Sequence, residues 1–192
     1  KTQAAIWHAD DELDYQYGNA VQAGQKFEVG RLTIEAINTP GHTPNSFSYL
    51  LYDFSNELLM VFTGDALFAG DTGRVDLMGE ENMDELAHKL YDSIYNKILP
   101  LGDGVILCPA HGAGSVCGDT IAEREFTTIG LERKVNPNLQ YENETDFVEN
   151  IKGVLERPPY FRKMEELNLK GAKPIDDLPS AAALNPKQFK GI

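Results

Sequence analysis

Residues 58–65 read LLMVFTGD, a run of apolar side chains that ends in a glycine and a carboxylate. Two further strand-like segments, residues 31–38 and 105–107, lead in the same way to His42 in TPGHT and to His111 in PAHG. Short apolar runs of this kind are typical of buried strands, and loops that follow strands carry chemistry on a rigid scaffold. We therefore expect a sheet in which three strand ends bring their polar residues to one edge.

The polar residues at these three strand ends, His42, Asp65 and His111, are potential metal ligands. Neutral imidazole nitrogen and carboxylate oxygen bind borderline divalent metals, and an open-sided set of two histidines and one carboxylate suits non-haem iron(II). Taken singly, His42 could be a turn histidine, and Asp65 could be a turn or cap residue. Because Asp65 follows a buried apolar run, an uncompensated carboxylate would be costly there. The sequence therefore favours one or two transition-metal ions at this edge.

Three more residues lie in loops near the expected site. Arg74 and Asp76 in GRVD could orient a ligating residue, bind an anionic substrate, or form an ion pair that stabilises the loop. Cys117 in GSVCG follows His111 and is either a partly exposed thiol close to the site or a buried, inert side chain.

The chain has 192 residues, which is enough for one globular domain with a substantial core. We expect one domain with an extended tail. The formal net charge of -13 argues against binding to nucleic acid or to an anionic membrane, because both need a basic surface. No run approaches the ~18 apolar residues that span a bilayer, and the first residues show no signal-peptide pattern. The two cysteines, Cys108 and Cys117, are too few for a disulfide scaffold. These features predict a cytoplasmic protein.

The hydrophobic pattern predicts strands first and helices later. Alternation and short apolar runs predict strands at residues 4–8, 26–29, 31–38, 47–54, 58–62 and 105–108. Helical spacing predicts helices at residues 83–98, 120–135, 145–155 and 161–167, with Asn82 and Thr145 as caps of the first and third. We assign residues 1–157 to one domain and residues 158–192 to an extended arm or linker.

Four motifs of the chain resemble those of the metallo-β-lactamase superfamily. They are TPGHTP at residues 39–44, FTGDALF at 62–68, GDTGRVDL at 70–77 and PAHGAGS at 109–115. They are most similar to the branch of glyoxalase II and the persulfide dioxygenases (sulfur dioxygenases), in particular bacterial members that carry rhodanese domains. The resemblance covers most of residues 1–130 and implies an α/β fold, the αββα sandwich of that superfamily.

One motif of the family does not occur in this sequence. Members open with an HxHxDH motif after an early strand, and these letters appear nowhere in the chain. We therefore expect the C-terminal portion of the sandwich only. Residues 123–186 resemble the segment that joins such a domain to a rhodanese domain. A half-sandwich exposes one apolar sheet face, which predicts a homo-oligomer or association with an N-terminal segment.

The resemblance implies an iron(II)-dependent dioxygenase that oxidises glutathione persulfide, or another low-molecular-weight persulfide, with O2 to sulfite and thiol. One Fe(II) ion would be held by His42, Asp65 and a histidine of the absent motif, so the chain alone is expected to be inactive. His111, Arg74 and Asp76 would then serve the reaction around the metal, and Arg74 and Cys117 would meet the substrate.

Two alternatives remain open. In a dinuclear thioester hydrolase of the glyoxalase II type, with Zn(II), His111 would ligate a second ion and Asp65 would bridge the two. In the other, the chain is a non-catalytic, metal-free fragment or binding domain.

Overall fold

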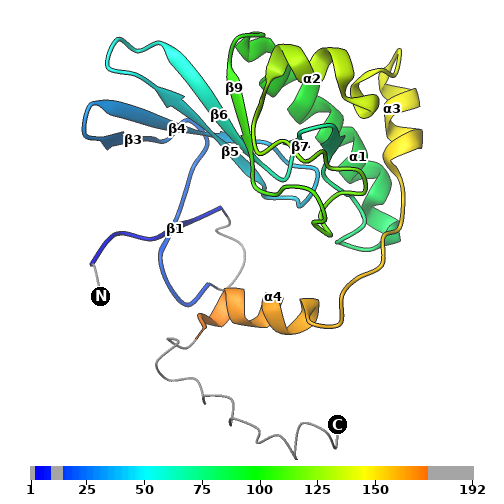
Figure 1. The fold of residues 1–192 in the computed structure, drawn as a ribbon. Coiled ribbons are helices and arrows are strands. Elements are labelled where there is room, and N and C mark those ends of the chain that lie inside the picture. Colours follow the sequence, from blue (N-terminus) through cyan, green and yellow to red (C-terminus); the bar gives the residue numbers. More distant parts are fainter. Residues whose placement is uncertain (1–2, 10–14, 173–192) are drawn as a thin grey trace, which may run out of the picture.

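A six-stranded sheet is the centre of the fold in the computed structural model, which describes residues 3–9 and 15–172 (Figure 1). Its strand order is β10-β9-β6-β5-β4-β3, antiparallel except for the parallel pair of β6 and β9. The strands are β3 (Lys26–Val29), β4 (Leu32–Asn38), β5 (Phe47–Tyr52), β6 (Leu58–Gly64), β9 (Ile106–Pro109) and β10 (Thr127–Thr128). The central strands lie where the alternation predicted them.

Two small two-stranded sheets accompany the large one. β7 (Leu67–Phe68) and β8 (Asp71–Thr72) form a tight hairpin directly after β6. β1 (Trp7–His8) and β2 (Asn19–Ala20) pair in parallel, so the strand predicted at residues 4–8 is shorter than expected.

Three helices, α1, α2 and α3, cover one face of the sheet, whereas α4 lies apart from them near β1 (Figure 1). Tyr17 Oη donates a hydrogen bond of 2.7 Å to the Asn168 carbonyl in α4. The helices are α1 (Met83–Asp92), continued by a π-helical turn (Ser93–Ile98) and a 3-10 turn (Leu99–Leu101), α2 (Ile129–Val135), α3 (Glu144–Ile151) and α4 (Phe161–Lys170), with further 3-10 turns at Glu80–Asn82 and Pro137–Leu139. None of the helices in residues 3–9 and 15–172 has both the length and the apolar surface to cross a membrane.

The core lies between the sheet and these helices. Leu50, Val61 and Leu107 are paired across β5, β6 and β9 and are almost fully buried. They pack in one cluster with the buried stripe of α1 and its π-helical continuation, Leu86, Leu90, Ile94 and Ile98. This spacing confirms the helix predicted at residues 83–98.

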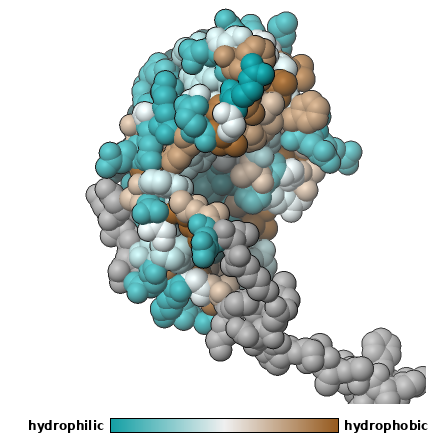
Figure 2. Space-filling view, turned by 90° about the vertical axis from the view of Figure 1, so that its left-hand side faces the viewer, coloured by the Kyte–Doolittle hydropathy of each residue, from teal (hydrophilic) through white to brown (hydrophobic). Residues whose placement is uncertain are grey.

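The opposite face of the sheet is less covered. Tyr49, Phe62 and Cys108 lie side by side on it, and Phe62 is 39% exposed. On the side of the molecule seen in Figure 2, hydrophobic residues reach the surface beside hydrophilic ones, around a hollow near the middle of the view. Association through this face stays a prediction.

Several details of the helices differ from the sequence prediction, and α4 ends at Lys170 rather than at residue 167. The helix predicted at residues 120–135 begins only at Ile129, because β10 and a loop precede it and Thr128 caps it by accepting a hydrogen bond from the Leu131 amide. Asn143 rather than Thr145 caps α3, which ends at Ile151. Asn82 makes no capping bond, because its side-chain amide donates to the Met78 carbonyl instead. Most of the predicted arm, residues 173–192, lies outside the described residues.

Candidate metal centre

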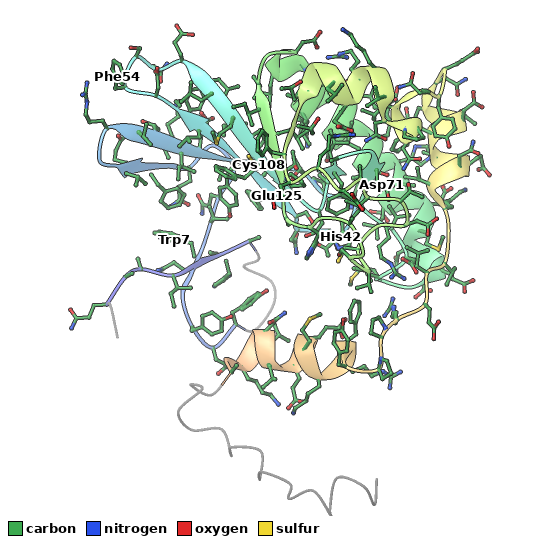
Figure 3. All side chains as sticks on the ribbon, in the orientation of Figure 1. Trp7, His42, Phe54, Asp71, Cys108 and Glu125 are labelled. Carbon is green, nitrogen blue, oxygen red and sulfur yellow. The ribbon has the colours of Figure 1, made fainter. Side chains whose placement is uncertain are left out.

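The ends of three strands meet at one edge of the sheet. β4 is antiparallel to β5, β5 is antiparallel to β6, and β6 is parallel to β9, so β4, β6 and β9 run in the same direction. His42, Asp65 and His111 follow these strands and therefore converge. In Figure 3, His42 lies at the end of the sheet away from the hairpin tip that carries Phe54.

Asp65 is the centre of this group. Its Oδ1 lies 3.1 Å from Nε2 of His111 and 3.9 Å from Nε2 of His42. The predicted convergence is therefore confirmed as a geometry, while the metal itself stays a prediction.

His42 is held by its backbone and by its own ring. The turn that carries it packs on α1, since a Cβ atom on Gly41 would lie only 2.5 Å from Cβ of Leu90. The ring is buried, and Nδ1 lies 2.9 Å from the Arg74 carbonyl, which can only accept. The proton is therefore on Nδ1, and the lone pair of Nε2 is free to face Asp65.

The environment of His42 favours its neutral form. Burial lowers the pKa of His42 and outweighs the opposing attraction of Asp65 and the hydrogen bond to Arg74. A neutral imidazole is the form that binds a metal ion.

Asp65 carries an unsatisfied oxygen. Its Oδ1 is buried and has no hydrogen-bond partner, because the nearby His111 nitrogen does not have hydrogen-bond geometry. A buried carboxylate oxygen without a partner is destabilising by the cost of its lost hydration. A cation between Asp65 and the two imidazoles would remove that cost, so the donor set fits a metal ion.

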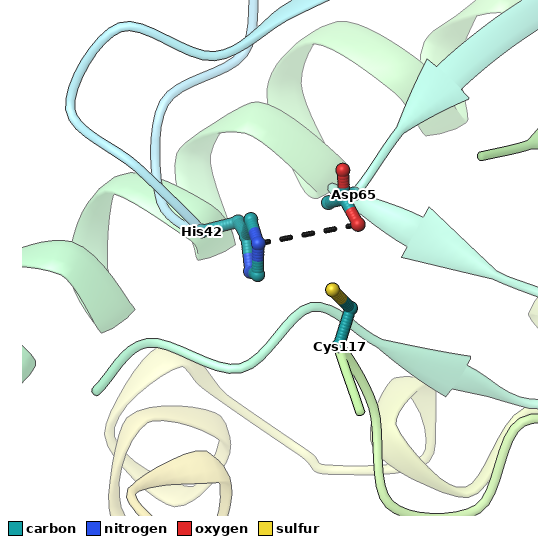
Figure 4. A group of neighbouring side chains, drawn as sticks. All are labelled: His42, Asp65 and Cys117. Carbon is teal, nitrogen blue, oxygen red and sulfur yellow. Dashed lines mark ion pairs between the residues drawn. The ribbon is translucent and has the colours of Figure 1, made fainter. Parts of the chain in front are cut away.

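Cys117 belongs to the same group. Ligand atoms of His42, Asp65 and Cys117 all lie within 4.8 Å of one another (Figure 4). Burial and the neighbouring Asp65 carboxylate raise the pKa of the Cys117 thiol. The thiol therefore lies close to the site, and contact between Cys117 and a substrate stays a prediction.

Gly73 makes this close approach possible, and sequence reasoning did not single it out. A Cβ atom at this position would lie 1.9 Å from the Asp65 carbonyl oxygen and 3.2 Å from Cβ of His42. Only glycine allows the chain to pass behind both ligand candidates. Its place in GDTGR was the available signal.

Arg74 and Asp76 form a buried ion pair, in which each side chain is 2% exposed. The guanidinium donates to both carboxylate oxygens of Asp76 and to the carbonyls of Val116 and Leu155. The structure thus shows the loop-stabilising ion pair, and the Arg74 carbonyl orients His42. Through these contacts, Arg74 supports the loops around the site. Contact between Arg74 and a substrate stays a prediction.

The environment of Asp76 favours the charged form of its carboxylate. Burial alone would raise the pKa of Asp76, but its hydrogen bonds to Arg74 and to the Leu155 amide, with the attraction of Arg74, lower it overall. The carboxylate therefore ties the loop around residue 76 to the segment that follows α3.

Two further carboxylates hold the surrounding loops, and neither was predicted. Asp71 accepts hydrogen bonds from the Asp119 and Thr120 amides through Oδ2, and from the Thr72 amide and Asn138 through Oδ1. Glu132, fully buried in α2, accepts from the Gly70 amide and from Arg124 and Asn136. These bonds link segments far apart in the sequence, which a local pattern does not reveal.

A cleft of about 630 Å³ lies beside the centre. It is lined by the loops around residues 70–74 and 118–124 and by the end of α3, and Gly73 and Arg74 belong both to its wall and to the support of the ligand candidates. A small molecule in this cleft would lie against the segment that supports His42.

Comparison with known proteins finds similar proteins and structures, although no protein-family model matches the chain. The persulfide dioxygenase ETHE1, mitochondrial, of Bos taurus is 30% identical over 172 residues, which are 90% of this chain and 51% of the relative. The hydroxyacylglutathione hydrolase GloC of Haemophilus influenzae is 32% identical over 118 residues, 62% of this chain and 46% of the relative.

Among solved structures, a metallo-beta-lactamase from Staphylococcus aureus is similar with a TM-score of 0.81 at 30% identity, over 95% of this chain and 55% of that one. This similarity confirms the predicted fold class. The chain spans about half the length of the curated relatives it matches.

Proposed function

Because this chain belongs to the metallo-β-lactamase superfamily, in the branch of persulfide dioxygenases and glyoxalase II-like hydrolases, we propose that the protein is an iron(II)-dependent persulfide dioxygenase. Its substrate would be glutathione persulfide or another low-molecular-weight persulfide. The outer sulfur loses four electrons to O2, one water is consumed, and sulfite, the thiol and two protons are released.

The observation that carries this proposal is the buried, unpartnered Oδ1 of Asp65, which faces the Nε2 atoms of two histidines. A bound iron(II) ion would supply open coordination positions for O2 and the outer sulfur. The residues that would hold it are His42 and Asp65, as the sequence motifs predict.

The chain's own residues orient and support this centre. The hydrogen bond from Nδ1 of His42 to the Arg74 carbonyl keeps Nε2 directed at the site. His111 is 39% exposed and lies beside Asp65, so it can exchange a proton with solvent next to the reacting sulfur. Cys117 lies within 4.8 Å of the ligand atoms of His42 and Asp65, where its thiol would meet an incoming persulfide.

The test is metal analysis of protein purified without oxygen, both as this chain and as a version extended upstream in the gene through any HxHxDH motif. The proposal expects iron near one ion per chain in the extended version, with sulfite formed from glutathione persulfide. Absence of metal from both versions would overturn it and favour the non-catalytic alternative.

A second candidate is the dinuclear thioester hydrolase. The 3.1 Å separation of His111 Nε2 and Asp65 Oδ1 supports it, because a carboxylate this close to a second imidazole can bridge two ions. The similarity of this chain to the hydroxyacylglutathione hydrolase GloC also supports this candidate. Zinc at about two ions per chain, with hydrolysis of a glutathione thioester and no sulfite, would establish this function instead.

A further inference from the structure

The thiol of Cys117 lies where a metal ligand would lie. Its Sγ, an imidazole nitrogen of His42 and a carboxylate oxygen of Asp65 are within 4.8 Å of one another (Figure 4). Bonds of about 2.0–2.3 Å from zinc to nitrogen, oxygen and sulfur place tetrahedral ligands roughly 3.3–3.7 Å apart. The three side chains therefore need to close by only about an ångström around an ion.

The loop that carries Cys117 is fixed on both sides. The Cys117 carbonyl accepts from the Arg74 amide at 3.1 Å, and the preceding Val116 carbonyl accepts from the Arg74 guanidinium at 3.0 Å. On the other side, the Asp71 carboxylate binds the amides of Asp119 and Thr120 at 2.8 and 2.7 Å. Cys117 is thus presented to Asp65 by a buried network.

The unsatisfied oxygen of Asp65 is an independent indication of a cation at this point. Oδ1 is buried without a hydrogen-bond partner, although the Cys117 thiol interacts with the Asp65 carboxylate as a hydrogen-bond donor. Because Nδ1 of His42 is occupied by the Arg74 carbonyl, its Nε2 is the nitrogen available to share the ion.

We propose that Cys117 is a third protein ligand, and that this chain binds one zinc-type divalent ion through His42 Nε2, Asp65 Oδ1 and Cys117 Sγ. The inference rests on the metal centre of the proposed function and adds a ligand to it. On binding, the S–H bond of Cys117 breaks, the proton leaves to solvent and an Sγ–metal bond forms. Nitrogen, oxygen and thiolate sulfur together suit zinc.

This ligand set has a consequence for the site. Sulfur from the protein occupies a position that an iron dioxygenase would leave open to O2 or to the persulfide. Three protein ligands would leave the fourth position of a tetrahedral zinc ion open, so the zinc-loaded form would differ from the iron-loaded one by its sulfur ligand.

The test is titration of the folded chain with cobalt(II), which substitutes for zinc and shows an intense sulfur-to-metal charge-transfer absorption when a thiolate ligates it. The expected result is this band, saturating at about one ion per chain. Cys117→Ser should abolish the band and weaken binding at least ~10-fold, the smallest loss typical of a residue that supports a metal. Circular dichroism checks that the variant is folded.

Two variants keep the outcomes separate. Cys108→Ser, in the chain's other cysteine on β9, should leave the band unchanged, and Asp65→Asn should remove or greatly weaken binding. Cobalt binding without the band, or equal binding by the parent and Cys117→Ser, would overturn the Cys117 ligand and leave the His42–Asp65 centre standing. Failure of the folded chain to bind cobalt at all would overturn the three-ligand site, whereas the iron centre of the proposed function is overturned only if the upstream-extended version also binds no metal.

Discussion

Two kinds of carboxylate lie around the candidate metal centre: three that are buried, and Asp65, whose side chain is 25% exposed but whose Oδ1 atom is buried. Asp71, Asp76 and Glu132 each accept several hydrogen bonds from amides or cationic side chains, whereas Oδ1 of Asp65 accepts none. A buried carboxylate is stable only when its charge is compensated. The first three are compensated within the chain and hold the loops in place, whereas Asp65 lacks the partner that an ion would supply. The difference distinguishes the carboxylates that form the scaffold of the site from Asp65, the candidate metal ligand.

Removing a compensated carboxylate should have the largest effect. Asp76→Ala leaves the Arg74 guanidinium buried and unpaired, so we expect the free energy of unfolding to fall by about 3–5 kcal/mol. Urea denaturation measures this. Asp84→Ala is the matched control, because Asp84 pairs with Lys152 at the surface and its loss should change little. Equal effects of the two substitutions would remove the distinction.

Asp65→Asn should weaken metal binding without lowering the stability of the metal-free chain, the opposite of the effect of Asp76→Ala. It replaces the unsatisfied charge by a neutral amide, so the metal-free chain should unfold at the same or a higher urea concentration. Zinc affinity, measured by isothermal titration calorimetry, should fall by more than ~100-fold, since a ligand is lost rather than an outer partner. A metal-free variant as unstable as Asp76→Ala would show that Asp65 belongs to the scaffold.

Gly73→Ala should lower both the stability of the chain and its affinity for zinc. The new Cβ atom would meet the Asp65 carbonyl at 1.9 Å, so the backbone must shift, at a cost of about 1–3 kcal/mol, and zinc should bind more weakly. Gly112→Ala is the control in a neighbouring loop, because a Cβ atom there meets nothing within 4 Å. If the two glycines behave alike in thermal unfolding and zinc titration, the close packing behind the ligands is unimportant.

The smallest expected effect is on acid stability. The pKa of Asp76 is lower in the folded chain than in the unfolded one, so the unfolded state binds more protons in that range. The stabilisation is complete above the ordinary carboxyl pKa, about 4, and is lost as the pH falls through the folded value. The unfolding free energy of the parent should therefore drop more steeply below pH 4 than that of Asp76→Asn. Parallel curves would show that Asp76 is not the group responsible.

The sequence predicted the strands and the meeting of His42, Asp65 and His111 because both depend on local signals: alternation within a strand and a polar residue at its end. It did not predict Asp71, Glu132 or Gly73, whose roles depend on partners far along the chain: Gly70 and Glu132, for example, are 62 positions apart. The error at residues 120–128 has the same origin. The hydrogen bond that the Thr120 amide donates to the Asp71 carboxylate holds the start of that segment as a loop, and pairing with β9 holds its end as β10, against its helical pattern.

The parallel pairing of β6 with β9 also bears on how the chain folds. β3 to β6 form by successive hairpins, with short loops to close, whereas β9 can join β6 only after residues 65–105, including α1, have closed into a crossover. The entropy of closing that long segment makes this contact slow to form. His42 and Asp65 can therefore approach each other early, but His111 and Cys117 reach them only when the crossover is complete. In a refolding experiment, the rate at which the Cys117 thiolate joins a metal ion held by His42 and Asp65 would report the docking of β9.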